Sequence, residues 1–270
     1  MNDNLKFSII TVNLNNAEGL RKTIDSVINQ SYANCDHIII DGGSADNSLK
    51  VIKEFEPIFK LRQRNINWVS EPDNGIYNAM NKGINIAKGD YLIFMNSGDT
   101  FYSKNTLETV SLLIDGSEFV YGNAHVIDHN NSWFEIFPQK LTLGFMACKF
   151  LCHQAIFYHR NIFEKIGLYN ESIKVHADWY LNTRVLFFEN NTSQHINTTI
   201  CNFDRNGISS NSSDIKKQLN QVKSKLLPLK IWEELALSYS NERKLSLLKQ
   251  SRLIKLLSIL SRNISKTLTK

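Results

Sequence analysis

Long apolar runs and targeting signals are both missing from this sequence of 270 residues. No run of 18 apolar residues occurs, so the sequence predicts no membrane-spanning helix. The first four residues lack the basic region of a signal peptide, and the apolar run Phe7–Val12 is too short and too rich in β-branched residues to serve as one. We therefore expect the protein to stay in the cytoplasm.

Paired cysteines and the common glycine-rich nucleotide loops are also absent. The four cysteines form no CxxC pair, and a zinc site would need two more Cys or His at suitable spacing, so buried, reduced thiols are expected. Neither GxGxxG nor GxxxxGK[ST] occurs. Their absence argues against a dinucleotide-dependent oxidoreductase and against a P-loop kinase.

Charge is unevenly distributed. The segment from Asp214 to Lys270 holds ten Lys and three Arg against one Asp and three Glu, a net charge of +9. The total is +5, which leaves −4 for the rest of the chain. A basic tail on a mildly acidic body suggests contact with a polyanion or an anionic membrane surface.

Strand-like and helix-like segments alternate through the first hundred residues. The strand-like runs are Phe7–Leu14, His37–Asp41, Asn67–Ser70 and Tyr91–Met95. Between them lie three stretches whose apolar residues recur three or four positions apart, as on one face of a helix. This alternation predicts an α/β fold with a mostly parallel central sheet flanked by helices.

The pattern of apolar residues changes twice in the rest of the sequence. Residues 119–157 contain short alternating runs, which predict mixed or antiparallel strands that extend the sheet, and helices are expected over Asn161–Ile166 and Asp178–Phe188. The last segment carries an apolar stripe from Leu253 to Ile264 among basic residues, which predicts an amphipathic helix. We divide the chain into a domain of residues 1–210 and a basic helical extension of residues 211–270.

The amphipathic C-terminal helix has two interpretations. It could pack on the domain or on a second subunit of a homo-oligomer, or it could lie in a membrane interface. Nucleic acid is not an expected partner, because no aromatic residues are interleaved with the basic ones.

Three polar residues stand at the ends of predicted strands. Ligands of parallel α/β sheets bind at the carboxyl ends of the strands, and Asn13, Asp41 and Asp99 lie at such ends. Asp99 follows a buried strand in a turn with Asn96 and Ser97, so the turn offers one carboxylate and neutral oxygens to Mg²⁺ or Mn²⁺. The alternative is that Asp99 caps the next helix.

Asp178 is the candidate general base. It lies at the start of a predicted helix, where nearby backbone N–H groups can keep a carboxylate ionised while it faces a cleft. An ordinary N-cap is the alternative reading of the same position.

Five segments in fixed order resemble glycosyltransferase family two. They are Phe7–Asn13, Ile39–Asp46, Ser70–Gly83, Gly89–Asp99 and His153–Asp178. The resemblance covers about Phe7 to Phe188. It implies the GT-A nucleotide-diphospho-sugar transferase fold and inversion of anomeric configuration.

The resemblance also implies roles for single residues. Thr11, Asn13 and Asp41 would contact the nucleoside, and Asp73, Gly75 and Asn81 would lie by the nucleotide or donor sugar. Asn96 to Asp99, including Ser97, would correspond to the metal-binding turn, with Asp99 as the ligand. Asp178 would be the base, and His153, Gln154 and Trp179 would lie on the acceptor side.

One departure from the family pattern concerns the metal turn. Asn96 and Gly98 occupy positions that relatives often fill with Asp, which leaves Asp99 as the one acidic residue of the turn. We expect weaker cation affinity in the absence of donor, because fewer anionic ligands are present. This form of the turn resembles a branch of the family associated with surface polysaccharide and glycolipid assembly.

The sequence therefore predicts an inverting, metal-dependent glycosyltransferase. It would move a sugar from a nucleoside diphosphate donor, by default a UDP-sugar, to a hydroxyl of a sugar or lipid-linked acceptor, with a peripheral position at the inner face of the cell membrane. Two alternatives stay open. The first is a nucleotidyltransferase, although such an enzyme would usually carry a basic Gly-rich loop after the first strand. The second is a non-catalytic nucleotide-sugar-binding subunit, which would account for a metal turn with only one acidic residue.

Overall fold

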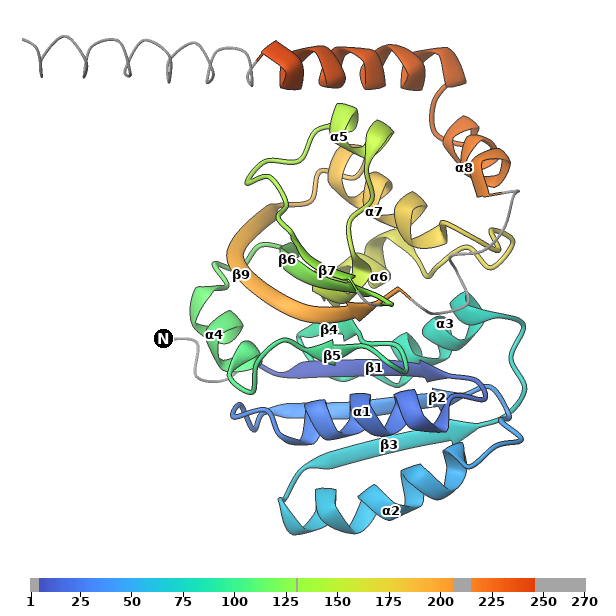
Figure 1. Ribbon diagram of the computed structural model, residues 1–270, viewed down its shortest axis with the longest axis vertical. Helices are drawn as coiled ribbons and strands as arrows, with labels where there is room; N and C mark the ends of the chain where they lie inside the picture. Colours follow the sequence, from blue (N-terminus) through green and yellow to red (C-terminus); the bar gives the residue numbers. More distant parts are fainter. Residues whose placement is uncertain (1–4, 130, 206–214, 246–270) are drawn as a thin grey trace, which may run out of the picture. The chain divides into compact units, whose positions relative to one another are not determined.

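The computed structural model describes residues 5–129, 131–205 and 215–245 (Figure 1). The chain divides into two compact units, one of Met1–Leu141 with Phe150–Val222 and one of Thr142–Lys149 with Lys223–Lys270. The expected domain boundary between residues 210 and 211 lies outside the described residues, as does the amphipathic segment from Leu253 to Ile264. Both stay predictions.

The first unit is built on one nine-stranded sheet. Its strand order is β3-β2-β1-β4-β8-β6-β9-β5, with β7 paired to β6. The strands are β1 (Phe7–Asn13), β2 (Cys35–Asp41), β3 (Asn65–Ser70), β4 (Tyr91–Phe94), β5 (Thr100–Phe101), β6 (Phe119–Asp128), β7 (Asn131–Glu135), β8 (Ile156–His159) and β9 (Ser193–Asp204). The helices of the two units include α1 (Ala17–Ile28), α2 (Ser48–Leu61), α3 (Ile76–Ile86), α4 (Thr106–Leu113), α5 (Leu143–Cys148), η1 (His153–Ala155), α6 (Asn161–Ile166), α7 (Ala177–Phe187) and α8 (Ile215–Ser224).

The four strands of the N-terminal half are parallel to one another, as predicted. β1 and β2 are buried along their whole length, because helices cover both faces of the sheet. Ile39 of β2 packs in a cluster with residues of α1 and α2, whereas Ile10 of β1 faces Gly83 of α3. The apolar stripes predicted from the sequence are the faces that make these contacts.

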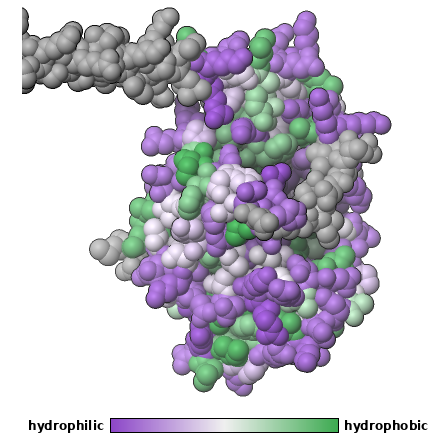
Figure 2. Space-filling model, viewed as in Figure 1, coloured by the Kyte–Doolittle hydropathy of each residue, from purple (hydrophilic) through white to green (hydrophobic). Residues whose placement is uncertain are grey.

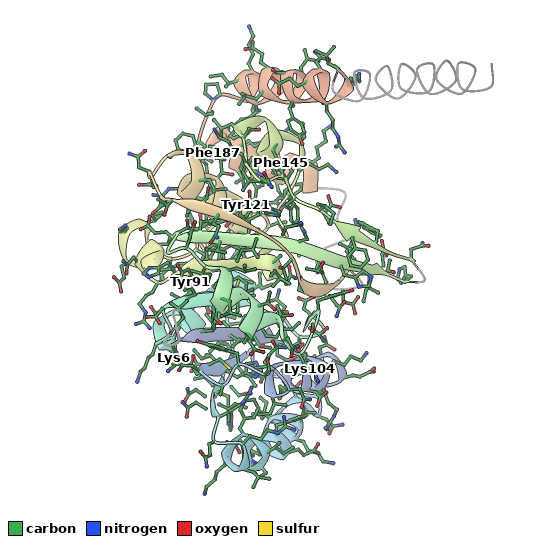
Figure 3. The ribbon with its side chains drawn as sticks, turned by 90° about the vertical axis from the view of Figure 1, so that its left-hand side faces the viewer. Lys6, Tyr91, Lys104, Tyr121, Phe145 and Phe187 are labelled. Atoms are coloured by element: carbon green, nitrogen blue, oxygen red, sulfur yellow. The ribbon has the colours of Figure 1, made fainter. Side chains whose placement is uncertain are left out.

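The second half of the sheet is mixed. β8 runs antiparallel to β4 and β6, and β7 is antiparallel to β6, which confirms the prediction for residues 119–157. β9 pairs parallel with β6 and antiparallel with the short β5. Tyr91 and Tyr121 are buried among these strands (Figure 3). Apolar side chains on the face shown in Figure 2 form separate patches.

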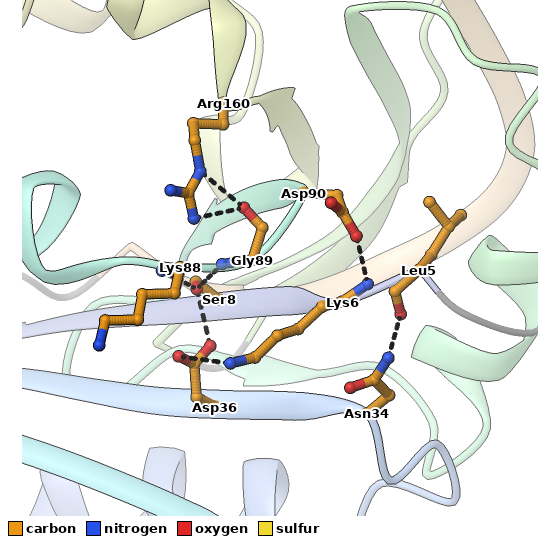
Figure 4. A network of polar contacts seen from close by, with 9 residues as sticks. All are labelled: Leu5, Lys6, Ser8, Asn34, Asp36, Lys88, Gly89, Asp90 and Arg160. Atoms are coloured by element: carbon orange, nitrogen blue, oxygen red, sulfur yellow. Dashed lines mark hydrogen bonds and ion pairs between the residues drawn. The ribbon is translucent and has the colours of Figure 1, made fainter.

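A polar network closes the amino edge of the sheet (Figure 4). Ser8 Oγ donates to Asp36 Oδ1 at 2.7 Å and accepts from the backbone N–H of Gly89 at 2.9 Å, and Lys6 Nζ lies 3.4 Å from Asp36 Oδ2. These contacts tie β1, β2 and the residues before β4 to one another. They satisfy the polar groups at this edge within the protein, and the candidate residues lie at the opposite edge.

The second unit combines α5 with a helix over residues 229–245. Lys223 Nζ donates to Ala147 O at 2.8 Å and lies 5.8 Å from the centre of the Trp232 ring, whose Nε1 donates to Lys223 O. None of the helices in the described ranges has the length and apolar character that a membrane crossing requires.

Candidate active site

The carboxyl ends of β1, β2 and β4 meet at one edge of the sheet and are joined by hydrogen bonds. Asn13 Nδ2 donates to Asp41 Oδ1 at 2.7 Å, and Ser97 Oγ donates to Asn13 Oδ1 at 2.8 Å. Asn13 therefore links the end of β2 to the turn after β4. The topology brings these predicted site residues together because parallel strands end on the same edge.

Asp41 is saturated with hydrogen-bond donors. Its Oδ1 accepts from Asn13 and from the Ser44 hydroxyl at 2.6 Å, and its Oδ2 accepts from Ser44 N at 3.0 Å and from the Ser70 hydroxyl at 2.6 Å. Burial acts to raise the pKa of Asp41, but hydrogen bonds from Ser44, Ser70 and Asn13 outweigh it, so its pKa lies below the ordinary value. The carboxylate is ionised and held in place.

The turn after β2 makes room for a second carboxylate. A Cβ on Gly42 would lie 2.5 Å from Asp73 Oδ2, so glycine at this position lets Asp73 approach the end of β2. Asp73 Oδ1 accepts from Gly75 N at 2.9 Å, and Gly75 has φ +111 immediately before α3. Asp73 and Gly75 thus form one small turn beside the end of β2.

Three predicted site side chains are buried and engaged elsewhere. The Thr11 hydroxyl lies 2.8 Å from His37 Nε2 inside the sheet–helix layer. Asn81 accepts from Tyr169 N and donates to Tyr169 O and Glu171 Oε1, so it holds the segment before α7 against α3. Trp179 is 2% exposed and belongs to the core. All three side chains are buried within the protein, and their expected contacts with a ligand stay predictions.

The turn over Asn96–Asp99 is braced from α1. Thr23 Oγ1 donates to Asp99 O at 2.7 Å and accepts from Gly98 N at 3.0 Å. Gly98 has φ +110, a conformation that glycine adopts without steric cost. Asp99 caps no helix, because β5 follows it and Asn105 is the N-cap of α4. The alternative reading of Asp99 as a cap is therefore wrong.

The Asp99 carboxylate is buried with few donors. Its Oδ2 accepts from Gln154 Nε2 at 2.8 Å and its Oδ1 accepts from Asp204 N at 3.0 Å. Burial dominates over these bonds and over the nearby charge of His153, and it raises the pKa of Asp99 to about 6. The ionised form is thus incompletely stabilised by the protein alone.

These features fit a cation held partly by the protein and partly by a substrate diphosphate. Asn96 Oδ1 is buried and has no hydrogen-bond partner among the described residues, whereas Asn96 Nδ2 lies 3.1 Å from His153 Nε2. Among the described residues no group of three or more His, Cys, Asp and Glu side chains could hold a metal. Mg²⁺ typically takes one or two protein carboxylates and completes its shell with phosphate and water. Asp99 and Asn96 match that requirement.

Asp178 lies in the first turn of α7 and is held by two side chains. Tyr77 Oη donates to its Oδ1 at 2.9 Å, and His153 Nδ1 lies 3.5 Å from its Oδ2. Burial acts to raise the pKa of Asp178, but the hydrogen bond and charge of His153 and the bond from Tyr77 lower it below the ordinary value. The N-cap of α7 is His176, so the reading of Asp178 as an ordinary N-cap is wrong.

The side chain of Asp178 remains 21% exposed. Its lowered pKa keeps this partly exposed carboxylate ionised at neutral pH. Because His153 contacts both Asn96 and Asp178, it links the metal turn to the candidate base.

Several residues of this site were not predicted from the sequence. Tyr77 lies four residues after Asp73 and Asp204 lies at the end of β9, far from their partners along the chain. Tyr77 is within the family-like segment Ser70–Gly83, so a phenol at a helix start beside a candidate carboxylate could have been noted. Thr23 and Asp204 carry no sequence signal, because an ordinary threonine in a helix and a backbone N–H make their contacts.

Comparisons with known proteins agree with this geometry. The model of the family described as Glycosyl transferase family 2 matches residues 8–167. A PGL/p-HBAD biosynthesis glycosyltransferase of Mycobacterium bovis (strain BCG / Pasteur 1173P2) is 32% identical over 219 residues, which cover 80% of this chain and 83% of that protein.

Two solved structures share the fold at low sequence identity. S. aureus TarS 1-349 in complex with UDP-GlcNAc has a TM-score of 0.65 at 15% identity over 88% of this chain and 72% of that one. The chain spans 43% of a longer S. aureus TarS chain. The mannosyltransferase PcManGT from Pyrobaculum calidifontis, in complex with GDP-Man and Mn2+, has a TM-score of 0.62 at 12% identity over 87% and 69% of the two chains. The GT-A fold expected from the sequence is thereby confirmed.

Proposed function

The chain belongs to glycosyl transferase family 2, and we propose that it moves a sugar from a nucleoside diphosphate donor to an acceptor hydroxyl with inversion at the anomeric carbon. UDP is the nucleotide we propose. The complexes of TarS with UDP and UDP-GlcNAc support this choice, whereas the PcManGT complex holds GDP-Man. Membership of the family favours the transferase over the nucleotidyltransferase that the sequence had left open.

The observation that carries the proposal is the pair of unlike carboxylates at one edge of the sheet. Asp178 is ionised and partly exposed, as a general base must be. Asp99 is buried with a raised pKa, which is expected for a metal ligand whose charge the protein alone stabilises poorly. Asn13, Asp41 and Ser97 line the edge between the nucleoside end and the metal turn. One carboxylate thus serves the acceptor and the other serves the leaving group.

The reaction is a single displacement. Asp178 accepts the proton of an acceptor hydroxyl, and the oxygen of that hydroxyl attacks the anomeric carbon from the face opposite the diphosphate. The bond between the sugar and the diphosphate breaks, and its electron pair leaves with the diphosphate. A divalent cation on Asp99 and Asn96 would offset the negative charge that develops there. Tyr77 and His153 hold the base in orientation.

For the acceptor we propose a sugar or lipid-linked sugar of surface polysaccharide or glycolipid assembly. The name of the mycobacterial relative, which refers to PGL/p-HBAD biosynthesis, supports this class. A peripheral position at the inner membrane face would suit a lipid-linked acceptor, and the +9 charge of the C-terminal segment supports it. Binding to anionic liposomes tests this part, and absence of binding by the full chain would reject it.

The first experiment is a thermal-shift panel of nucleoside diphosphate sugars with and without Mn²⁺, on the native chain and on Asp99→Ala. A ligand at 100 times its Kd stabilises a protein by about 2.7 kcal/mol, which is readily measured. We expect one nucleotide to raise the Tm, more strongly with Mn²⁺, and the Mn²⁺ increment to be lost in Asp99→Ala. A flat panel in all conditions would reject the proposal.

A further inference from the structure

The short helix η1 lies between the two carboxylates of the site. Its first two residues, His153 and Gln154, contact Asp178 and Asp99 respectively. A 3-10 helix has three residues per turn, so adjacent side chains point about 120° apart and can reach different partners. Ala155 and Ile156, which follow, are fully buried, so the turn is anchored in the core.

Gln154 is fixed at both ends of its amide. Cys152 Sγ donates to its Oε1 at 3.0 Å, and its Nε2 donates to Asp99 Oδ2 at 2.8 Å. Because the thiol bonds to the oxygen, the amide nitrogen faces the carboxylate. Gln154 is 2% exposed, so its side chain is placed to orient Asp99 and not to touch an acceptor.

His153 stands between the metal turn and the base. Asn96 Nδ2 donates to its Nε2 at 3.1 Å, which leaves the proton on Nδ1, the atom 3.5 Å from Asp178 Oδ2. With Tyr77 Oη on Oδ1, both oxygens of Asp178 have a donor. The carboxylate plane is thereby fixed, and the remaining lone pairs can face a substrate hydroxyl.

We propose that His153 and Gln154 are positioning residues with separate tasks: Gln154 orients Asp99 toward the cation, and His153 orients the base Asp178. The proposal rests on the proposed transferase function. It replaces the acceptor-side contacts expected from the family resemblance for these two residues. Residues that orient a ligand from the outer shell typically contribute 10- to 100-fold to metal affinity or activity.

Mn²⁺ binding tests the task of Gln154 without relying on turnover. Electron paramagnetic resonance of free Mn²⁺ in the presence of UDP gives the half-saturating concentration for the native chain and for Gln154→Met, which keeps the volume and removes the donor. We expect an increase of about 10- to 100-fold. The matched control is Gln30→Met, a second buried glutamine whose amide donates to Ser26 O and Ser103 O. An unchanged value in Gln154→Met, or an equal shift in the control, would overturn the assignment.

Two conservative variants test the task of His153. Asn places an amide nitrogen near the position of Nδ1 and can still donate to Asp178, whereas Gln reaches the position of Nε2 and can keep only the contact with Asn96. The measurement is UDP release from UDP-glucose, UDP-galactose or UDP-GlcNAc, using whichever of these the native chain hydrolyses fastest. We expect His153→Asn to retain at least 10-fold more kcat than His153→Gln, with similar KM for the donor.

The pH profile separates positioning from general damage. The titratable groups that face Asp178 are Tyr77, His153, Tyr158 and Tyr169. The three tyrosines have pKa values raised by burial, so they stay neutral over the range tested. Removing the Nδ1 donor in His153→Gln should move the acid limb of kcat/KM to higher pH. Equal rates and equal acid limbs in the Asn and Gln variants would overturn the role of His153.

The native chain decides which claim has failed. If it binds no Mn²⁺ in the presence of UDP and releases no UDP from any of the three donors, the proposed function is rejected. The other case is an active native chain in which Gln154→Met leaves Mn²⁺ affinity unchanged and the two His153 variants have equal kcat. The proposed function then stands, and the positioning roles are rejected.

Discussion

Asp41 and Asp99 are two buried aspartates at the same edge of one sheet, yet their pKa values move in opposite directions. Asp41 has hydrogen bonds from Asn13, Ser44 and Ser70, and its pKa is lowered. Asp99 has one side-chain donor and one backbone donor, and burial raises its pKa to about 6. Burial acts to raise the pKa of both carboxyl groups, and the hydrogen bonds outweigh it at Asp41 but not at Asp99.

The source of the donors also differs. Ser44 lies three residues from Asp41, whereas Gln154 and Asp204 lie 55 and 105 residues from Asp99. The surroundings of Asp41 are therefore largely complete when the N-terminal strands are formed. The turn over Asn96–Asp99 is completed only by η1 and β9, and it still lacks enough donors to balance its charge. This difference supports the proposal that Asp41 is a scaffold for the edge and Asp99 a metal ligand.

The largest expected effect is that of replacing Asp178, the candidate base. Asp178→Asn keeps the size of the side chain and removes the base, so we expect the transfer rate to fall about 10²- to 10⁴-fold. UDP affinity, measured by calorimetry, should change far less, because Asp178 lies with His153 and Tyr77 and away from Asp41. A rate within 10-fold of the native value would show that Asp178 is not the base.

The same substitution at Asp41 should destabilise the protein. In Asp41→Asn an NH₂ group must face either Asn13 Nδ2 or Ser44 N, both of which are donors. We expect the free energy of unfolding to fall by about 2–4 kcal/mol, since each buried donor left without an acceptor costs about 1–3 kcal/mol. Urea denaturation at pH 7.5 measures it. A neutral effect would mean that the four contacts of Asp41 contribute nothing net.

At Asp99 we expect a smaller loss. In Asp99→Asn an NH₂ group must face Gln154 Nε2 or Asp204 N, both of which are donors, but without a cation the substitution also removes a buried charge that the protein stabilises poorly. The loss in the free energy of unfolding at pH 7.5 should therefore be about 1–2 kcal/mol smaller than in Asp41→Asn. The increase of Tm on adding Mn²⁺ with UDP should disappear. Equal destabilisation by Asp41→Asn and Asp99→Asn would contradict the comparison between the two aspartates.

The dependence on pH sharpens the comparison. The raised pKa of Asp99 gives a contribution to stability that is full below the ordinary value of 3.8 and is lost as pH rises through about 6. The lowered pKa of Asp41 gives a contribution that is present above 3.8 and is lost as pH falls below it. The cost of Asp99→Asn should therefore shrink as pH rises between about pH 4 and pH 6, while the cost of Asp41→Asn should shrink on acidification below pH 4. Urea curves across this range test both trends.

The smallest expected effect lies inside the β1–β2 pair. Thr11→Val is isosteric and removes the bond to His37, whose Nδ1 has no partner among the described residues. We expect a loss of about 1 kcal/mol in the free energy of unfolding, the typical net value of one hydrogen bond. A loss above about 3 kcal/mol would show that burial of His37 depends on Thr11 more than its single contact suggests.

Local patterns were enough to predict the elements of the N-terminal half. The stripe of Leu20, Ile24 and Ile28 becomes the buried face of α1, and the run after Cys35 becomes a fully buried strand. The segment over residues 119–128 was expected as two short runs and forms one strand, β6, because pairing with both β8 and β9 extends it. The end of such a strand is decided by its neighbours in the sheet, and these cannot be inferred from the local sequence.

The position of a site residue in the fold was easier to predict than the direction of its side chain. The ends of strands placed Asn13, Asp41 and Asp99 together, since the direction of parallel strands is fixed by their connections. Predicted roles for side chains depended on which way each one points. Thr11, Asn81 and Trp179 point into the protein, and Gln154 points at Asp99. The residue pattern of one strand or helix does not show which distant residue will form a hydrogen bond with a given polar side chain.

The sequence by itself determined the family, the alternation of strands and helices, and the carboxylates available at one edge of the sheet. These follow from apolar periodicity and short motifs, which are local properties of the chain. Only the tertiary structure decided that a shell of donors lowers the pKa of Asp41, that burial raises the pKa of Asp99, and that one turn contacts both Asp99 and Asp178. The physical reason is that the protonation and orientation of a buried carboxylate depend on donors within about 3 Å in space, and most donors to Asp99 and Asp178 come from residues more than fifty positions away.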